Sequence, residues 1–212
     1  MKIQSIPEAT ITRLSLYSRF LDKLEEQEVS NVSSVEIARG IQGTPAQVRK
    51  DLAYFGDFGT RGVGYNVSHL NGVLKNILGV DHEWNMVLIG AGNLGSALTH
   101  YSGFKKSGFR IQAVFDNDVN KIGMKLNGIQ IFPITKLVDY ITENNVEIVV
   151  MAIPATAAQD VADLLCQTNI KGIMNFSPSP LSVCSSIEIR QVDLTVNLEV
   201  LSYSIKNKDA LE

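Results

Sequence analysis

The 212-residue sequence predicts an α/β protein with two domains, because its hydrophobic pattern changes near residue 80. Before that point apolar residues such as Leu14, Tyr17 and Leu21 recur at helical spacing. After it, short apolar runs such as MVLIG (86–90) alternate with helical stretches, which is typical of parallel β-α-β units. We therefore expect one domain over residues 1–80, a second over 81–191, and a C-terminal helix within 192–212.

The composition restricts the class of protein further. Apolar residues make up 45% of the chain and charged residues 19%, which supports a packed core and argues against disorder. No apolar run reaches the ~18 residues of a membrane helix, and the N-terminus is too polar for a signal peptide. Cys166 and Cys184 are too few for a disulfide framework and lack zinc-site spacing. We therefore expect a cytoplasmic protein with no membrane partner and no metal, whose cysteines are reduced, buried, small hydrophobic residues.

The net charge of −3 is spread unevenly, because residues 1–80 carry nine Lys or Arg against eight Asp or Glu, and the remainder carries ten against fourteen. Neither part is strongly basic, so nucleic-acid binding would require a local basic patch. A helix-turn-helix pattern offers a place for one. Ser33 and Thr44 each begin a capping-box pattern, with Glu36 and Gln47 three residues later, and a glycine turn separates the two helices.

The second of these helices, about residues 45–55, has two contrasting faces. Val48, Leu52 and Phe55 fall at i, i+4 and i+7 and face the predicted core. The other faces carry small residues, cations and amides, which permit close approach to DNA and hydrogen bonds to bases or phosphates. A solvated face on an ordinary helix is the alternative. The candidate DNA-contacting residues of this helix are Gln47, Arg49, Lys50 and Tyr54.

A glycine-rich segment, DFGTRGVGYNV (57–67), follows this helix directly. It predicts a small hairpin that presents Arg61, as the wing of a winged helix would. The negative potential of a narrow minor groove attracts an arginine in that position. With the two preceding helices, the hairpin favours a winged-helix domain that binds double-stranded DNA over a surface hairpin with an incidental arginine.

The second domain begins with a strand that runs into a GxGxxG motif and a helix. Gly90 would form the tight turn, Gly92 would let the backbone approach a pyrophosphate, and Gly95 would allow close helix–strand packing. Free N–H groups at the start of the helix would bind the phosphates. The predicted cofactor loop comprises Gly90, Ala91, Gly92, Asn93, Leu94, Gly95 and Ser96.

Asp116 ends the next predicted strand, 21 residues after Gly95. The dinucleotide-binding pattern places an acidic residue about 20 residues on, where it binds the ribose hydroxyls. Because a carboxylate in that place repels a 2′-phosphate, we expect NADH and NAD+ as cofactors rather than their phosphorylated forms. The pattern therefore predicts a Rossmann-type dinucleotide-binding domain.

An NAD-dependent oxidoreductase with a helical N-terminal appendage is the alternative function. Hydride transfer needs an acid–base or electrophilic group over the nicotinamide, and His69, His82 and His100 form no such set. The second domain has room for about one dinucleotide fold and none for a substrate domain. We therefore expect no catalytic residues. A module for another adenine nucleotide, such as coenzyme A, is a third possibility, which Asp116 disfavours because it favours a free ribose diol.

The C-terminal helix is apolar on two opposite sides, and Asp193 is placed to cap it. A helix with two such sides has to be sandwiched between partners. We expect it to pack against a second subunit of a homodimer, by exchange; burial within its own domain is the alternative. One stripe consists of Leu194, Leu198, Leu201 and Ile205, and the other of Val196, Val200 and Tyr203.

Two segments, GTPAQVRKDLAYFGDFGTRGVGYNV (43–67) and GAGNLGSAL (90–98), closely resemble the Rex redox-sensing transcriptional repressors. The likeness extends to NFSP (175–178) and VDLTVNLEVLSY (192–203). The resemblance implies a homodimer with exchanged C-terminal helices that binds palindromic operator DNA. NADH would release the DNA, whereas NAD+ would compete for the site without releasing it. The expected targets are genes for NADH reoxidation and fermentation.

The resemblance also implies roles for individual positions. Arg49, Lys50 and Arg61 match DNA-contacting residues, and the glycine loop and Asp116 match the dinucleotide site. Tyr101 matches an aromatic residue near the nicotinamide.

The resemblance also assigns two positions to the release of DNA by NADH. Arg19 and Asp193 match a charged pair that links the DNA-binding helix to the cofactor end. Leu194 departs from the pattern, because some relatives carry a phenylalanine that stacks near the nicotinamide, so the cofactor contact at this position is expected to differ.

Overall fold

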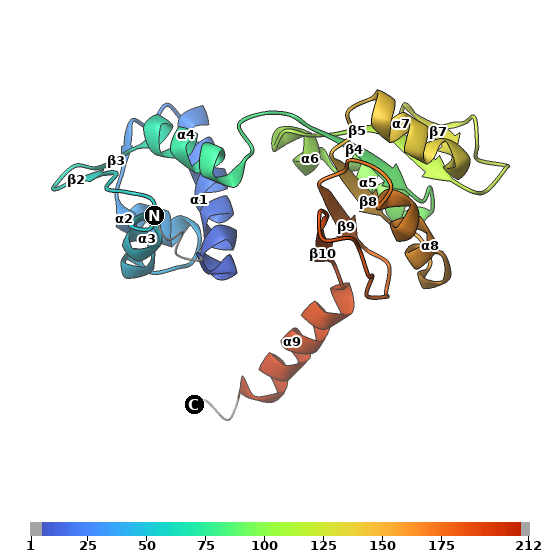
Figure 1. The fold of residues 1–212 in the computed structure, drawn as a ribbon. Helices are drawn as coiled ribbons and strands as arrows, with labels where there is room; N and C mark the ends of the chain where they lie inside the picture. Colours follow the sequence, from blue (N-terminus) through green and yellow to red (C-terminus); the bar gives the residue numbers. More distant parts are fainter. Residues whose placement is uncertain (1–5, 209–212) are drawn as a thin grey trace. The chain divides into compact units, whose positions relative to one another are not determined.

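The computed structural model describes residues 6–208, so the outer ends of the predicted segments 1–80 and 192–212 lie outside the described residues. The chain forms two compact units, one that ends at His82 and one that begins at Glu83. Figure 1 shows the helices and strands of both units. None of the described helices is long and apolar enough to cross a membrane.

The N-terminal unit combines four helices with a small antiparallel sheet (Figure 1). The strand order of that sheet is β1-β3-β2, so the hairpin of β2 and β3 forms a wing beside the helices. This is the winged-helix arrangement. Its elements are α1 (Glu8–Glu26), β1 (Asn31–Val32), α2 (Ser34–Gly40), α3 (Pro45–Leu52), β2 (Gly59–Thr60), β3 (Gly64–Asn66) and α4 (Val67–Leu78).

Side-chain caps fix where two of these helices begin. Ser33 and Glu36 form the complete predicted capping box at the start of α2, with the Ser33 N–H donating to Glu36 Oε2 at 2.8 Å. Thr44 caps α3 by accepting from the Gln47 N–H at 3.2 Å. The reciprocal half of a second capping box was predicted there and is wrong, because the Gln47 side chain instead donates to Asp51 Oδ1 at 2.8 Å.

The core of the N-terminal unit lies where α1 packs against α3 and α4. Leu14, Tyr17 and Leu21 of α1 are fully buried, as the helical spacing predicted. Val48 and Leu52 meet them from α3, and the predicted inward side of α3 is confirmed. Each fully buried aliphatic side chain of this kind contributes about 1.5–3 kcal/mol, so the core sets which side of α3 remains outward.

The C-terminal unit is built on a seven-stranded sheet with the order β10-β9-β8-β4-β5-β7-β6. All pairings are parallel except that of β6 with β7. The chain runs from β4 through β5 to β7 on one side, then returns to β8 on the other side of β4, so the strand order reverses between β4 and β8. The strands are β4 (Trp84–Ile89), β5 (Phe109–Asp116), β6 (Lys125–Leu126), β7 (Ile129–Pro133), β8 (Ile148–Met151), β9 (Gly172–Asn175) and β10 (Glu188–Gln191).

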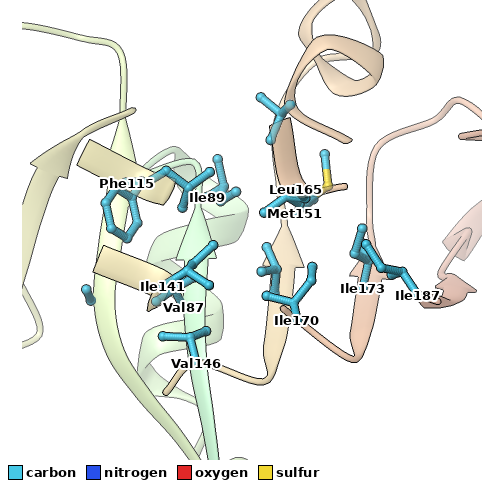
Figure 2. Packing of buried hydrophobic residues seen from close by; sticks show 14 of the residues in the cluster. Val87, Ile89, Phe115, Ile141, Val146, Met151, Leu165, Ile170, Ile173 and Ile187 are labelled. Atoms are coloured by element: carbon cyan, nitrogen blue, oxygen red, sulfur yellow. The ribbon is translucent and has the colours of Figure 1, made fainter. Parts of the chain in front are cut away.

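Both faces of the central strands are buried, which explains why they read as continuous apolar runs in the sequence. Figure 2 shows one face, where Val87 and Ile89 of β4 lie near Phe115 of β5. Met86 and Leu88 belong to the core on the opposite face. The helices that follow the strands are α5 (Asn93–His100), α6 (Ser102–Lys106), α7 (Leu137–Glu143), preceded by a 3₁₀ turn (Ile134–Lys136), and α8 (Ala155–Leu165).

The last helix, α9 (Leu194–Lys206), has no buried residue among those described. Its apolar side chains are all exposed, from Val196 at 51% to Tyr203 at 71% of their accessible surface. Burial within its own domain, the alternative for this helix, is therefore wrong. A patch of this size marks an interaction surface.

The two cysteines differ from the prediction. Cys166 and Cys184 are half-buried rather than fully buried, and they touch: the Cys184 N–H donates to Cys166 Sγ at 2.9 Å. Cys166 directly follows α8, whereas Cys184 lies on the loop between β9 and β10. The two cysteines are 18 residues apart in the sequence, so no local pattern predicted that they would be in contact.

Candidate functional site

A cleft of about 570 Å³ opens at the carboxyl ends of β4, β5 and β8. The strand order reverses at this edge, which is where open α/β sheets bind their ligands. Its volume lies within the range of about 300–1,000 Å³ that is typical of small-molecule sites. The residues that line it include Gly90, Gly92, Asp116, Asp118, Lys121, Ala157 and Asp160.

The three glycines of the loop have distinct geometric requirements. Gly90 has a φ of 103°, in the left-handed region, and a Cβ there would collide with the carbonyl oxygen of Ala152. A Cβ on Gly95 would collide with the carbonyl oxygen of Gly90, so this residue allows α5 to pack closely on β4. Gly92 faces open space, which leaves its backbone accessible from the cleft.

The first turn of α5 supplies donors for an anion. Gly92 is the N-cap and offers no side-chain cap, so the N–H groups of the first turn, at Asn93 and Leu94, are not capped by its side chain. The Ser96 N–H already donates to Gly92 O at 2.8 Å. Ser96 can therefore offer a ligand its hydroxyl but not its N–H group.

Asp116 lies at the rim of the glycine loop with 8% of its surface exposed. Its carboxylate accepts from the Ala91 N–H at 2.7 Å and from the Asp118 N–H at 2.9 Å. Ala91 is therefore engaged with Asp116 and has no N–H free for a phosphate. Both carboxylate oxygens retain lone pairs that can accept ribose hydroxyls.

Sequence reasoning missed a cation in this cleft. Lys121 places Nζ 3.6 Å from Asp116 Oδ2 and 3.6 Å from Asp118 Oδ2. Its charge offsets part of the field with which Asp116 would repel a phosphate. No pattern in the sequence marks Lys121, because a turn of the backbone rather than helix or strand spacing brings it to Asp116.

Tyr101 lies outside this cleft. It is 56% exposed, packs edge-on against Phe104 with ring centroids 5.1 Å apart, and lines a second cleft of about 540 Å³. The structure therefore does not bring Tyr101 together with the glycine loop of its own chain. Within the described residues, no group of three or more His, Cys, Asp or Glu side chains is arranged to hold a metal ion.

The outward side of α3 carries the predicted DNA-contacting residues. Lys50 is exposed, and Arg49 is exposed while donating to Ser34 Oγ at 3.0 Å. α3 ends at Leu52 rather than near residue 55, so Tyr54 is exposed in the turn that follows the helix. Arg61 is exposed in the turn between β2 and β3. Gln47 differs from the others, because it is half-buried and its amide nitrogen is bound to Asp51.

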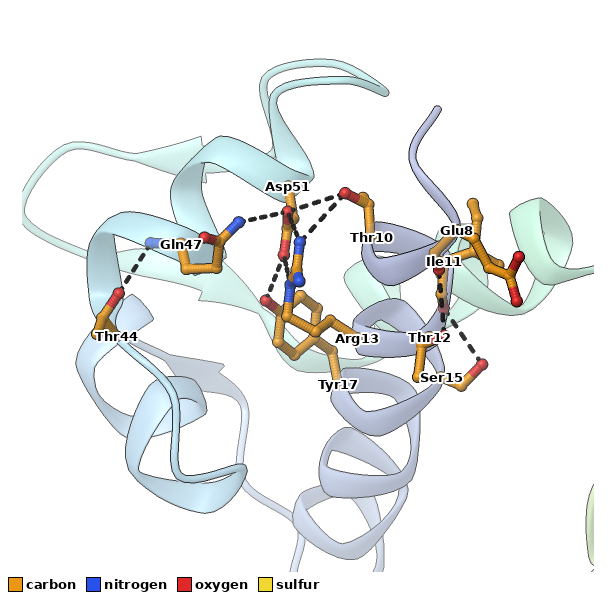
Figure 3. Close-up of polar contacts among 10 residues, drawn as sticks. All are labelled: Glu8, Thr10, Ile11, Thr12, Arg13, Ser15, Tyr17, Thr44, Gln47 and Asp51. Carbon is orange, nitrogen blue, oxygen red and sulfur yellow. Dashed lines mark hydrogen bonds and ion pairs between the residues drawn. The ribbon is translucent and has the colours of Figure 1, made fainter. Parts of the chain in front are cut away.

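Asp51 holds α3 against α1, as Figure 3 shows. Its side chain is fully buried and accepts two hydrogen bonds from the Arg13 guanidinium, at 2.6 and 2.8 Å. The Tyr17 hydroxyl donates to the same carboxylate at 2.7 Å. Sequence reasoning missed this cluster, although a signal existed: Asp51 lies next to Leu52 and three residues after Val48, on the inward side of α3.

The cluster keeps Asp51 ionised despite its burial. Burial raises the pKa of the Asp51 carboxyl group, but hydrogen bonds from Arg13, Tyr17 and Gln47 outweigh it and hold that pKa below its usual value. Burial, with the hydrogen bond to Asp51, raises the pKa of Tyr17 well above its ordinary value. At neutral pH the cluster is thus an ion pair with a neutral phenol.

Arg19 and Asp193 lie in different units. Arg19 is exposed on α1, and Asp193 is the exposed N-cap of α9, where Oδ1 accepts from the Thr195 N–H at 2.8 Å. The predicted cap on α9 is confirmed.

Comparison with known proteins extends over both units. The chain is 56% identical to a redox-sensing transcriptional repressor Rex of Carboxydothermus hydrogenoformans, over 97% of this chain and 99% of that one. It is 54% identical to a Rex repressor of Syntrophomonas wolfei, over 96% and 97%. The chain belongs to the Rex family.

The solved structures of RSP, a Rex-family repressor, share the fold of this chain. The crystal structure of RSP in complex with beta-NAD+ and operator DNA is 37% identical, with a TM-score of 0.89 over 98% of this chain and 95% of that one. The complex of RSP with beta-NADH has a TM-score of 0.85 at 36% identity, over 98% and 97%. The predicted fold class is confirmed by these matches.

Two family models match separate parts of this Rex-family chain. Residues 5–53 match a putative DNA-binding protein N-terminus, and residues 81–179 match a CoA-binding domain. The relatives are transcriptional repressors, and the protein is accordingly not an enzyme.

The Asp51 cluster generates a prediction about stability. Asp51→Asn removes one partner of a buried ion pair and should lower the free energy of unfolding by about 3 kcal/mol at pH 7, as measured by urea unfolding of the full chain. Because the pKa of Asp51 is lowered by folding, its contribution is complete above the unfolded pKa of about 3.9 and is lost as the pH falls through the folded-state value. The difference between wild type and variant should therefore shrink in acid.

The matched control is Asp57→Asn, the same change at an exposed position of the same unit. It should shift the unfolding free energy by less than about 0.5 kcal/mol. An equally small effect of Asp51→Asn would show that the buried charge contributes nothing to the fold.

Proposed function

We propose that this protein is a redox-sensing transcriptional repressor that binds palindromic operator DNA and is released from it by NADH. The observation that carries the proposal is the match, over nearly the whole chain, to a Rex-family structure that holds both NAD+ and operator DNA. The present structure has an outward cationic helix in one unit and a dinucleotide-type cleft in the other. A repressor of this kind works on the chromosome, so we place it in the cytoplasm.

For the DNA face, we assign base or phosphate contacts to Arg49 and Lys50 on α3 and to Tyr54 just after it, and a minor-groove contact to Arg61 on the wing. Their exposure supports this assignment. Gln47 has a smaller part than its position suggested. It is half-buried, and Asp51 accepts one of its two amide hydrogens, which fixes the orientation of the amide and leaves its oxygen and one hydrogen for a base.

For the cofactor, we assign NADH and NAD+ to the cleft at the glycine loop. The N–H groups of Gly92, Asn93 and Leu94 at the start of α5 face no side-chain cap and suit a pyrophosphate. The Asp116 carboxylate suits the ribose hydroxyls. Ala91 and Gly95 support the loop rather than the ligand, and Ser96 adds a hydroxyl.

Two other ligand classes have less support. Only the description of the family model over residues 81–179 favours coenzyme A, whose 3′-phosphate Asp116 would oppose. An NAD-dependent oxidoreductase would need a proton-transferring group at the cleft, and its lining residues include no histidine.

For assembly, we propose a homodimer in which α9 is covered by the second copy. The uniform exposure of its apolar residues supports this. A dimer also explains how one recognition helix per chain would meet a palindromic operator.

For the response to NADH, we propose that Arg19 and Asp193 pair in one state only and that Tyr101 contacts the nicotinamide end. NADH and NAD+ differ only at that end. Gly90 and Asp116 face the pyrophosphate and ribose, which are the same in both forms, so these residues cannot discriminate between them. Because Tyr101 is remote from the cleft of its own chain, its contact depends on the arrangement in the dimer.

Gel shifts on a palindromic AT-rich duplex test the DNA face. Lys50→Ala should weaken binding by about 1–3 kcal/mol if the lysine reads a base, and Arg61→Ala should lower affinity and the salt dependence. Lys125→Ala, the same loss of charge at an exposed site of the other unit, is the control and should bind like wild type. Equal affinity for a half-site, or binding that is insensitive to salt, would contradict a dimer held by phosphate contacts.

Calorimetric titration with NADH, NAD+, NADPH and coenzyme A tests the cleft. Asp116→Ala should bind NADH more weakly and shift the NADPH-to-NADH preference toward NADPH by about tenfold, since Lys121 then faces the 2′-phosphate alone. Asp116→Ala/Lys121→Ala should lose that shift. Asp139→Ala, at an exposed position outside the cleft, is the matched control. Unchanged preference in Asp116→Ala would remove the carboxylate from the ribose site.

The response is tested with variants of the proposed pair. Arg19→Ala and Asp193→Ala should bind DNA and NADH but fail to release DNA when NADH is added. Asp193→Ser separates charge from capping, because serine caps a helix as well as aspartate does. If Asp193→Ser releases DNA at the wild-type NADH concentration while Asp193→Ala does not, the residue acts only as a cap. Lys23→Ala, one turn from Arg19, is the control for α1.

A further inference from the structure

Neither DNA binding nor cofactor binding uses the two cysteines of the C-terminal unit. Cys166 and Cys184 come from different elements, the end of α8 and the loop between β9 and β10. The Cys184 N–H donates to Cys166 Sγ at 2.9 Å. Both are half-buried, so a small reagent has access to them.

The loop that carries Cys184 is already fixed to α8. The Gln159 side chain donates to Ser182 O at 2.8 Å and accepts from the Ser182 N–H at 3.0 Å. This double hydrogen bond lies about two helical turns along α8 from Cys166, and two residues before Cys184. The thiols are therefore held together by the fold, and a bond between them requires no large movement of the backbone.

We propose that Cys166 and Cys184 are a peroxide-oxidisable dithiol that closes to an intramolecular disulfide. The Cys184 thiolate attacks one oxygen of hydrogen peroxide, breaks the O–O bond, and becomes a sulfenic acid while hydroxide leaves. The Cys166 sulfur then attacks the sulfur of Cys184, forms the S–S bond and expels the hydroxyl group as water with the thiol proton. Peroxide is reduced by two electrons and the two thiols are oxidised by two.

The surroundings of the two sulfurs differ in a way that fits these roles. Hydrogen bonds with the Cys166 thiol and the Ser186 hydroxyl, 3.4 Å from Cys184 Sγ, lower the pKa of Cys184. The side chain of Cys184 raises the pKa of Cys166, and this effect outweighs the hydrogen bond from the Cys184 N–H, which lowers it. The thiolate is the reactive form, so Cys184 is the attacking sulfur and Cys166 the resolving one. A metal site is a poorer fit, since no third ligand joins the pair among the described residues.

The disulfide would act on the segment that leads to α9. It would tie the loop before β10 covalently to α8, and the other end of α8, at Ala157 and Asp160, lines the dinucleotide cleft. The proposal does not depend on the function of that cleft, because it concerns the chemistry of the two thiols alone.

Intact-mass spectrometry of the full-length protein tests the proposal. After reduction and desalting, a small excess of hydrogen peroxide should remove two hydrogens per chain, and an unreduced digest should join the peptides that contain Cys166 and Cys184. The oxidised protein should run as a monomer in denaturing gels without reductant and should melt several degrees higher than the reduced protein.

Single variants assign the roles. Cys166→Ser should stop at a sulfenic acid on Cys184, which dimedone traps, and Cys184→Ser should react several-fold more slowly than wild type. Ser185→Ala, an exposed neighbour whose side chain is not needed in this chemistry, is the control and should behave as wild type. Thiols that persist in peroxide, a link between chains instead of within one, or equal reactivity of Cys184→Ser and wild type would each overturn the proposal.

Discussion

A negative charge lies in the interior of the N-terminal unit, on the helix that we propose to enter DNA. An isolated carboxylate at a fully buried position would be strongly disfavoured, so Asp51 is tolerated only because α1 supplies a guanidinium and a hydroxyl in fixed positions. Arg13 and Tyr17 are four residues apart and lie on one side of α1, which means that α3 can neither rotate nor slide without breaking several short hydrogen bonds at once. The hydrophobic contacts of Val48 and Leu52 fix which side of α3 is buried, and the ion pair fixes the register in which it is held. The outward positions of Lys50 and Tyr54 follow from these two constraints together.

The same carboxylate explains where prediction from sequence succeeded and failed in this unit. Helical spacing and capping signals locate the helices well, because they depend on residues three or four apart: Ser33 and Glu36 form their capping box as expected. The second box did not form because Gln47 would have had to turn its amide oxygen toward the Thr44 N–H, whereas its amide N–H₂ instead donates to the buried charge of Asp51. Both Thr44 and Asp51 lie within four residues of Gln47, so sequence spacing alone cannot decide which of them its side chain binds. A carboxylate at an inward position of an amphipathic helix was nevertheless a visible signal that a cation had to lie opposite.

In the C-terminal unit, the central strands were predictable because both of their faces are buried. β10 was missed, since its sequence, EIRQ, is mostly exposed and its position is fixed by pairing with β9. The hairpin of β6 and β7 had a readable signal in Asn127-Gly128, whose positive φ values of 49° and 80° form the two-residue turn. In the candidate site, too, the sequence indicated some residues and not others. Asp116 was found from its spacing, whereas Lys121 reaches the same carboxylate by way of a turn, and Tyr101, placed by resemblance, lines a different cleft.

The exposed helix α9 links folding to assembly. It has 13 residues, and an isolated helix of about 12–15 residues is only marginally stable in water. The Asp193 cap contributes about 0.5–2 kcal/mol, which is less than the burial of even two of its apolar side chains would supply. Most of the stability of α9 must therefore come from whatever covers it, and a second copy of the chain is the cover we propose. In the proposed dimer, a change in the segment before α9 would act on the dimer contact and on the helix together, because covering of α9 by the second copy would stabilise both.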